Sequence, residues 1–171
     1  MKIEPNDIKV AIITASDKGY AGEREDLSGP AIREMMEAKG FTVTGITLTS
    51  DDPDMLKETM IDLADNAGAD IILTTGGTGF TSRDNTPDAT RAVIDRDAPG
   101  FPEAMRAESI RITPRGMLSR GTAGIRGRTL IINLPGSVKA VRECLAVIID
   151  ALQHAVEMIN DGQNCAERFN G

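Results

Sequence analysis

The chain has 171 residues, of which 40% are hydrophobic and 26% charged, and its formal net charge at pH 7 is −7. This length suits one folded domain, and the composition is too apolar for a disordered chain. The acidic balance argues against a general binder of nucleic acid or of anionic membranes, because either would need a basic face. We expect one domain over residues 1–171, with its core over about residues 8–162 and short tails outside it.

The first third of the chain alternates strand and helix patterns. Residues 8–14 are a run rich in β-branched side chains, which is typical of a strand buried on both faces. Ser28 predicts the cap of a helix that ends at Gly40, and residues 42–49 predict a second strand. The sequence also lacks the apolar runs of a membrane span or a signal peptide, so we expect a cytoplasmic protein.

The middle of the chain contains its most informative strand. Asp52 and Pro53 have the residue types of a helix cap and a first helical turn, and this helix is expected to reach about Gly68. Residues 70–75 then predict a strand that breaks directly into the glycine-rich stretch 76–79. A strand that ends in such a loop is the best candidate for a functional landmark.

The remaining elements complete an alternating pattern. We expect helices over residues 86–94, capped by Thr86, and 102–112, a short antiparallel strand over 123–125, a buried strand over 129–134, and a final helix capped by Ser137 that ends at Gly162. Strands that alternate with helices predict a mostly parallel sheet covered on both faces. The predicted fold class is therefore α/β, a three-layer αβα arrangement.

Unusual residues follow the predicted strands. In open parallel sheets, ligands bind outside the carboxyl ends of the strands, where the loops after residues 14, 49, 75 and 134 should meet. Main-chain N–H groups of a glycine loop suit anionic oxygens, and carboxylates beside them suit a Mg²⁺ that bridges to phosphate. The chain lacks both the GxGxxG fingerprint in its first unit and a GxxxxGK[ST] motif, although a purely structural turn at the glycines stays open.

The loop and its surroundings resemble a known signature. Residues 74–90 read TTGGTGFTSRDNTPDAT, and the likeness extends through 98–101 (APGF), 118–120, 123–126 and 132–137 (INLPGS). This resembles the molybdenum cofactor biosynthesis family that includes MogA and MoaB and the G domain of gephyrin, and it looks closer to the MogA branch. The likeness covers nearly all of the chain and implies the molybdopterin-binding, MogA-like fold.

The resemblance implies a reaction and a set of site residues. The reaction is molybdopterin adenylylation, in which the terminal phosphate of molybdopterin attacks the α-phosphorus of ATP and pyrophosphate leaves. Asp51 and Asp84 match the two functional aspartates, with Mg²⁺ or pterin-orienting roles that are not separated between them. The implied substrate- and nucleotide-binding residues are Thr75, Gly76, Gly77, Thr78, Gly79, Ser82, Arg83, Asn133, Pro135, Gly136 and Ser137.

Several simpler interpretations stand beside these roles. Asp51 is also placed to help cap the helix that begins near Pro53, and Asp84 to form a turn. For Asp17 and Asp26 we expect solvated loop positions. Arg83 is expected to pair with a phosphate or with Asp84.

The resemblance also implies partners. It implies a homotrimer that binds molybdopterin and ATP and hands its product to a molybdate-inserting enzyme. The alternative is a MoaB-type protein that binds molybdopterin without transferring AMP.

Overall fold

A six-stranded sheet with strand order β2-β1-β3-β6-β5-β4 lies at the centre of the computed structural model, which describes residues 2–168, with side chains described over 2–161. The four parallel strands are β1 (Lys9–Ala15), β2 (Thr42–Thr49), β3 (Ile71–Thr75) and β6 (Thr129–Leu134). The two antiparallel pairings at one edge involve β5 (Ala123–Arg126) and β4 (Arg96–Asp97). The predicted mostly parallel sheet is confirmed.

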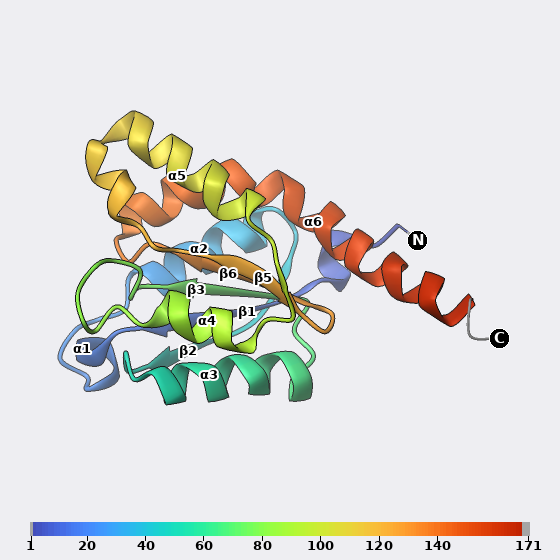
Figure 1. Ribbon diagram of the computed structural model, residues 1–171, viewed down its shortest axis with the longest axis horizontal. Helices are drawn as coiled ribbons and strands as arrows, with labels where there is room; N and C mark the ends of the chain where they lie inside the picture. Colours follow the sequence, from blue (N-terminus) through green and yellow to red (C-terminus); the bar gives the residue numbers. More distant parts are fainter. Residues whose placement is uncertain (1, 169–171) are drawn as a thin grey trace.

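Helices cover both faces of this sheet (Figure 1). One face carries α2 (Ser28–Ala38), α5 (Gly100–Ile112) and α6 (Val138–Arg168), and the other carries α3 (Pro53–Ile61) and α4 (Thr86–Val93). The one-turn helix α1 (Asp17–Tyr20) and three short helical segments, Pro5–Asp7, Asp62–Asn66 and Pro114–Leu118, complete the described elements. The three-layer αβα prediction is confirmed.

The alternation of side chains along each strand explains the two cores. In β1, Val10 and Ile12 join the core under α2, α5 and α6, whereas Ala11 and Ile13 join the core under α3 and α4. Successive side chains of a strand point to opposite faces, so a strand buried on both faces must be apolar at every position. The apolar stretches 10–13 of β1, 71–73 of β3 and 130–132 of β6 have this origin.

The parallel strands end level with one another. Ala15 of β1 pairs with Thr49 of β2, and Thr75 of β3 pairs with both Thr14 of β1 and Leu134 of β6. The loops that follow these four strands therefore start from one edge of the sheet. This edge is where ligands bind in open α/β sheets.

Two predicted helix caps are wrong. Ser28 and Thr86 are the first residues inside α2 and α4, and the side chains of Leu27 and Asn85, which precede them, accept no capping hydrogen bond. At α2 the cap comes from further upstream, because Asp26 Oδ1 accepts the N–H of Gly29 at 3.0 Å. A carboxylate accepts more strongly than a hydroxyl, which explains why it takes this place.

Three other expectations differ from the structure. α6 continues past Gly162 to Arg168, because one glycine inside a helix costs only about 1 kcal/mol. The expected tail before Ile8 is anchored instead: the N–H of Ile3 donates to Glu157 on α6 at 3.1 Å. The two-residue strand β4 was not expected, since two exposed charged residues carry no strand pattern. Within residues 2–168, no helix is long and apolar enough to cross a membrane.

Candidate active site

A cavity of about 610 Å³ opens at the carboxyl ends of the parallel strands. Its walls come from the loops after β1, β2, β3 and β6, together with the first residues of α2 and α6. Ligand pockets usually occupy about 300–1,000 Å³ and lie at this edge of α/β sheets. Both the size and the place fit a small-molecule site.

Gly76 and Gly77 form the floor of this cavity with backbone that only glycine adopts easily. Their φ angles are +92° and +64°. A Cβ on Gly76 would overlap the main-chain oxygen of Ala15, and one on Gly77 would overlap Thr86 Oγ1 and lie 3.0 Å from Asp51 Oδ1. The two glycines therefore let the loop after β3 pass close beneath Asp51.

Asp51 follows β2 and lies half-buried in the cavity wall. Its Oδ2 accepts the N–H of Asp17 at 2.9 Å, and its main-chain oxygen accepts the Nδ2–H of Asn85 at 2.9 Å. Burial raises the pKa of the Asp51 carboxyl, a shift that the N–H of Asp17 opposes and the charge of Asp17 reinforces. The helix cap at α3 belongs to Asp52, which accepts from Asp54 and Met55, so Asp51 is free of that task.

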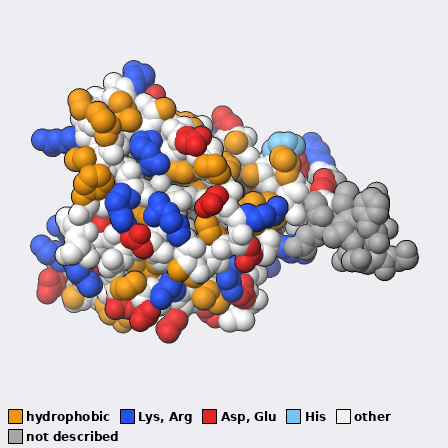
Figure 2. All heavy atoms as spheres, in the orientation of Figure 1, with side chains coloured by type: hydrophobic (Ala, Val, Ile, Leu, Met, Phe, Trp, Pro, Cys, Tyr) orange, Lys and Arg blue, Asp and Glu red, His pale blue; other side chains and the backbone are white. Residues whose placement is uncertain are grey.

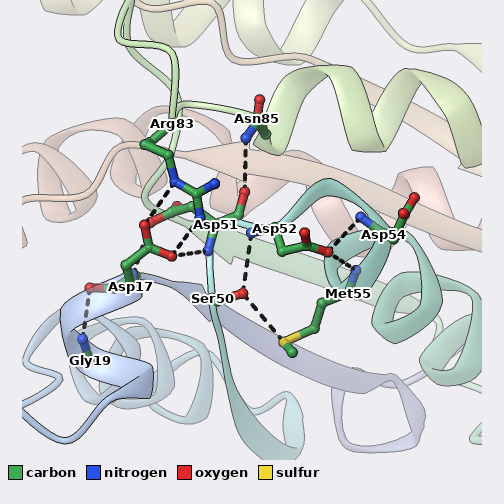
Figure 3. A network of polar contacts seen from close by, with 10 residues as sticks. Asp17, Gly19, Ser50, Asp51, Asp52, Asp54, Met55, Arg83 and Asn85 are labelled. Carbon is green, nitrogen blue, oxygen red and sulfur yellow. Dashed lines mark hydrogen bonds and ion pairs between the residues drawn. The ribbon is translucent and has the colours of Figure 1, made fainter.

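Asp17 and Arg83 form an ion pair beside Asp51 (Figure 3). Arg83 donates from Nε and Nη2 to the two Asp17 carboxylate oxygens, each at 2.9 Å, and Asp17 Oδ1 also accepts the N–H of Asp51 at 2.9 Å. The hydrogen bond from Arg83 lowers the pKa of the Asp17 carboxyl. Asp17 is 44% exposed, as expected, but it begins helix α1 instead of lying in a loop, and the partner of Arg83 is Asp17 rather than Asp84.

Asp84 lies across the same cavity from the loop after β3. Its Oδ2 accepts the N–H of Thr81 at 2.8 Å, so the turn role considered from the sequence is present. Within the described residues, hydrogen bonds reach Asp51 and Asp84 at Oδ2 and leave each Oδ1 without a protein donor. Each aspartate therefore keeps one oxygen for a ligand.

The charges of the cavity wall suit a divalent cation. Its acidic residues are Glu25, Asp26, Asp51 and Asp84, and Arg24 is the one basic residue among the lining residues, all of which belong to the described part of the chain. Within that part, no group of three His, Cys, Asp or Glu side chains is placed to hold a metal by itself. Mg²⁺ commonly takes one or two carboxylates and completes its shell with water and substrate phosphates. The free oxygens of Asp51 and Asp84 fit that donor set.

The predicted binding residues divide into two groups. Those that line the cavity beside Asp51 and Asp84 are Thr75, Gly76, Gly77, Gly136 and Ser137. Ser137 Oγ also accepts the N–H of Ala140 at 3.3 Å, as expected for the cap of α6, and Thr75 Oγ1 donates to the main-chain oxygen of Pro135 at 2.6 Å.

The second group lies outside the cavity wall. Asn133 is buried, and its side chain bonds to Thr74, Thr90 and Thr122, so it connects core segments. Pro135 faces a separate cavity of about 200 Å³ between α5 and α6. The others continue the glycine loop away from its floor: Thr78, Gly79, Ser82 and Arg83.

Residues 24–28 form a wall that sequence reasoning missed. Asp26 joins this loop to β1, since Thr14 Oγ1 donates to its Oδ2 at 2.9 Å. The expectation that Asp26 is merely solvated is therefore wrong. A usable signal was available, because this loop also follows a parallel strand at its carboxyl end.

Comparisons with known proteins agree with this geometry. The family described as "Probable molybdopterin binding domain" matches residues 11–154. A molybdopterin adenylyltransferase of Helicobacter pylori (strain J99) is 40% identical over 154 residues, covering 89% of this chain and 88% of the relative. The crystal structure of the molybdopterin biosynthesis enzyme MoaB from Thermus thermophilus matches with a TM-score of 0.85 and 49% identity, covering 89% of this chain and 96% of that one. A MogA structure matches with a TM-score of 0.84 and 42% identity, covering 88% and 99%. With its fold, its cavity and its sequence in agreement, the chain belongs to the molybdopterin-binding domain family.

Proposed function

We propose that the chain is a molybdopterin adenylyltransferase that transfers AMP from Mg-ATP to the terminal phosphate of molybdopterin and releases pyrophosphate. The observation that carries the proposal is that Asp51 and Asp84 line the same cavity as the Gly76-Gly77 turn, each with one carboxylate oxygen that accepts no protein hydrogen bond among the described residues. Relatives that carry this activity in their name are about 40% identical over most of the chain. This activity places the chain in molybdenum cofactor biosynthesis.

The proposed reaction asks mainly for positioning. A terminal phosphate oxygen of molybdopterin forms a bond to the α-phosphorus of ATP, and the bond from that phosphorus to the bridging oxygen breaks, so that pyrophosphate leaves with the electron pair. The nucleophile is already an anion, so the chain does not need a base to activate it. A Mg²⁺ held by Asp51 and Asp84 would supply positive charge at the phosphates.

The chain's own residues would position the two substrates. The turn at Gly76 and Gly77 lets phosphate groups come close to the main chain, and the beginning of α6 at Ser137 favours negative charge. Leu27 and Leu48 line the cavity while 58% and 41% exposed, which offers apolar surface to a heterocyclic ring. The excess of carboxylates in the wall explains why two anionic substrates would need a cation to bind there.

The proposal also covers the oligomeric state of the protein, its location in the cell and its partner. We propose a homotrimer that acts in the cytoplasm and passes adenylated molybdopterin to a molybdate-inserting enzyme. Hydrophobic side chains gather at the end of α5 and in the turn that follows it, at the upper left of Figure 2. The exposed residues there are Ile110, Ile112, Met117 and Leu118, and such a patch favours contact between subunits.

The test is incubation of the purified protein with molybdopterin, Mg²⁺ and ATP, with mass detection of the AMP adduct and of pyrophosphate. We expect both products, and we expect neither when EDTA is present or when molybdopterin is omitted. Tight binding of molybdopterin with no adduct would contradict the transferase and favour a MoaB-type binding protein. That alternative has its own support, because a structure named MoaB and one named MogA match with nearly equal TM-scores.

A further inference from the structure

We propose that Asp17 is a positioning residue for Asp51, and that Arg83 acts through Asp17 rather than by binding a substrate phosphate. The inference rests on the proposed function for its catalytic consequence and on the geometry of three connecting segments for its structural part. Asp17 begins the one-turn helix α1 that follows β1, Asp51 lies in the loop after β2, and Arg83 lies in the loop after β3 (Figure 3). These are three adjacent strands of the sheet.

Asp17 and Asp51 hold each other by a reciprocal pair of hydrogen bonds. The N–H of Asp17 donates to Asp51 Oδ2, and the N–H of Asp51 donates to Asp17 Oδ1, both at 2.9 Å. Asn85 also donates to the main-chain oxygen of Asp51. The backbone of Asp51 is therefore fixed on both sides, its Oδ2 is occupied, and its Oδ1 is turned toward the floor at Gly77.

This arrangement places two carboxylates close together, and Arg83 supplies the opposing charge. Its Nε and Nη2 contact both oxygens of Asp17 in the two-pronged geometry that guanidinium groups prefer with carboxylates. With those two nitrogens engaged, the side of the Arg83 guanidinium that binds a carboxylate or a phosphate is already occupied by Asp17. Arg83 is therefore better placed to hold Asp17 than to bind an incoming phosphate.

A contribution to overall stability is a poor explanation for the ion pair. The side chains of Arg83 and Asp17 are 55% and 44% exposed, and exposed ion pairs contribute little to stability. The chain contains a matched pair for comparison: Arg126 donates from Nε and Nη2 to Asp65 across a similar sequence separation. That pair packs near Val93, whose main-chain oxygen accepts from Arg126, and neither residue lines the candidate active site.

The kinetic test compares Asp17→Ala, Arg83→Gln and the double variant with wild type. We expect each single variant to lower kcat by about ten-fold or more, because the Asp51 carboxylate is no longer held in position. The KM for ATP and for molybdopterin should change less than about three-fold, because the residues that contact the substrates remain. The double variant should be no slower than Asp17→Ala, since Arg83 acts through Asp17. Asp17→Asn, which keeps one oxygen for the N–H of Asp51, should recover part of kcat.

Two kinetic results would overturn the inference. One is a raised KM for either substrate in Arg83→Gln with kcat unchanged and additive effects in the double variant, which would give Arg83 a direct substrate contact. The other is an unchanged kcat in Asp17→Ala. Arg126→Gln and Asp65→Asn are the controls, and both should keep the wild-type kcat.

A second readout does not depend on activity. Hydrogen exchange of the Asp51 amide, followed by NMR, should become at least about ten-fold faster in Asp17→Ala, because its acceptor is gone. The same amide should be unaffected in Asp65→Asn. If wild type transfers no AMP, the proposed function fails, and the exchange measurement still decides whether Asp17 holds Asp51. An unchanged exchange rate in Asp17→Ala would show that it does not.

Discussion

At the scale of single residues, a catalytic and a structural role of Asp84 can be tested separately, because its two carboxylate oxygens have different surroundings. Its Oδ2 accepts the N–H of Thr81, and its Oδ1 faces no protein donor among the described residues. Asp84→Asn keeps an oxygen for Thr81 and removes the negative charge from the cavity. We expect AMP transfer to slow by more than about ten-fold while the melting temperature changes little, measured by rapid mixing with excess enzyme and by thermal unfolding.

Asp95 provides the matched control for that variant. Like Asp84, it is a loop aspartate that accepts a main-chain N–H, in this case from Gly127 at 2.6 Å, but it is exposed and lies outside the cavity. Asp95→Asn should transfer AMP at the wild-type rate. Wild-type turnover in Asp84→Asn would remove Asp84 from the mechanism and leave it with its turn alone.

Asp51 and Asp17 predict stability changes of opposite sign. The pKa of Asp51 is raised by burial, so its stabilising effect exists below the unfolded pKa of about 3.9 and is lost as pH rises through the folded pKa. The pKa of Asp17 is lowered by Arg83, so its effect exists above the unfolded pKa and is lost as pH falls through the folded pKa. At pH 7 we expect a higher melting temperature for Asp51→Asn and only a slightly lower one for Asp17→Asn, because the ion pair of Asp17 with Arg83 is exposed to solvent.

Thermal unfolding of these two variants between pH 3 and pH 8 checks the signs. Both differences from wild type should shrink toward the acid end, because the carboxyls take up protons as the pH falls. A melting temperature of Asp51→Asn below wild type at pH 7 would mean that its hydrogen bonds outweigh the cost of burying its charge. Sequence reasoning identified Asp51 but not its partner Asp17, because the two residues lie 34 positions apart and only the fold brings them together.

At the scale of elements, the loop after β3 depends on Gly76 in two ways. Its φ of +92° disfavours any side chain, and a Cβ there would also overlap the main-chain oxygen of Ala15 at the end of β1. We expect Gly76→Ala to lower the free energy of unfolding by about 2–4 kcal/mol, through the unfavourable dihedral and the overlap together. Urea unfolding monitored by circular dichroism measures this difference.

Gly68→Ala is the control that measures the cost of the unfavourable φ angle alone, without any steric overlap. Gly68 has a φ of +66° but no atom within 4 Å of a Cβ built on it. Its substitution should cost only about 1–2 kcal/mol. Equal costs at the two positions would show that β1 and the loop after β3 move apart easily, which would contradict a rigid cavity floor.

The elements themselves were predictable where one local pattern decides them. The runs that became β2 and β6 were expected with the observed bounds: β2 is rich in β-branched residues although it lies at the edge of the sheet, and β6 is a buried strand with a run of apolar residues. The cap predicted at Ser28 was wrong because Asp26 supplies the capping acceptor instead, which the local residue types do not reveal. The cap predicted at Thr86 was wrong because Thr86 lies inside α4. β4 depends on its pairing with β5 and has no pattern of its own.

At the scale of the whole molecule, the family and the fold followed from the sequence, whereas the shape of the site required the structure. The TTGGTG stretch indicated the loop, and the level ends of the strands place it beside Asp51. The wall formed by residues 24–28 and the inward position of Asn133 depend on packing between distant segments. A pattern of residue types cannot show which side chains of a loop face a cavity.

The exposed apolar patch at the end of α5 carries the last prediction, which concerns assembly. Ile110 and Ile112 are each 40% exposed, and Met117 and Leu118 are 58% and 50% exposed. If this patch is a subunit contact, light scattering should give about three times the 18.2 kDa of one chain. Met117→Asp should shift the mass toward one chain, since burying an unpaired charge opposes association. Met158→Asp, at a side chain 63% exposed on α6, should leave the mass unchanged, and a monomeric wild type would contradict the trimer.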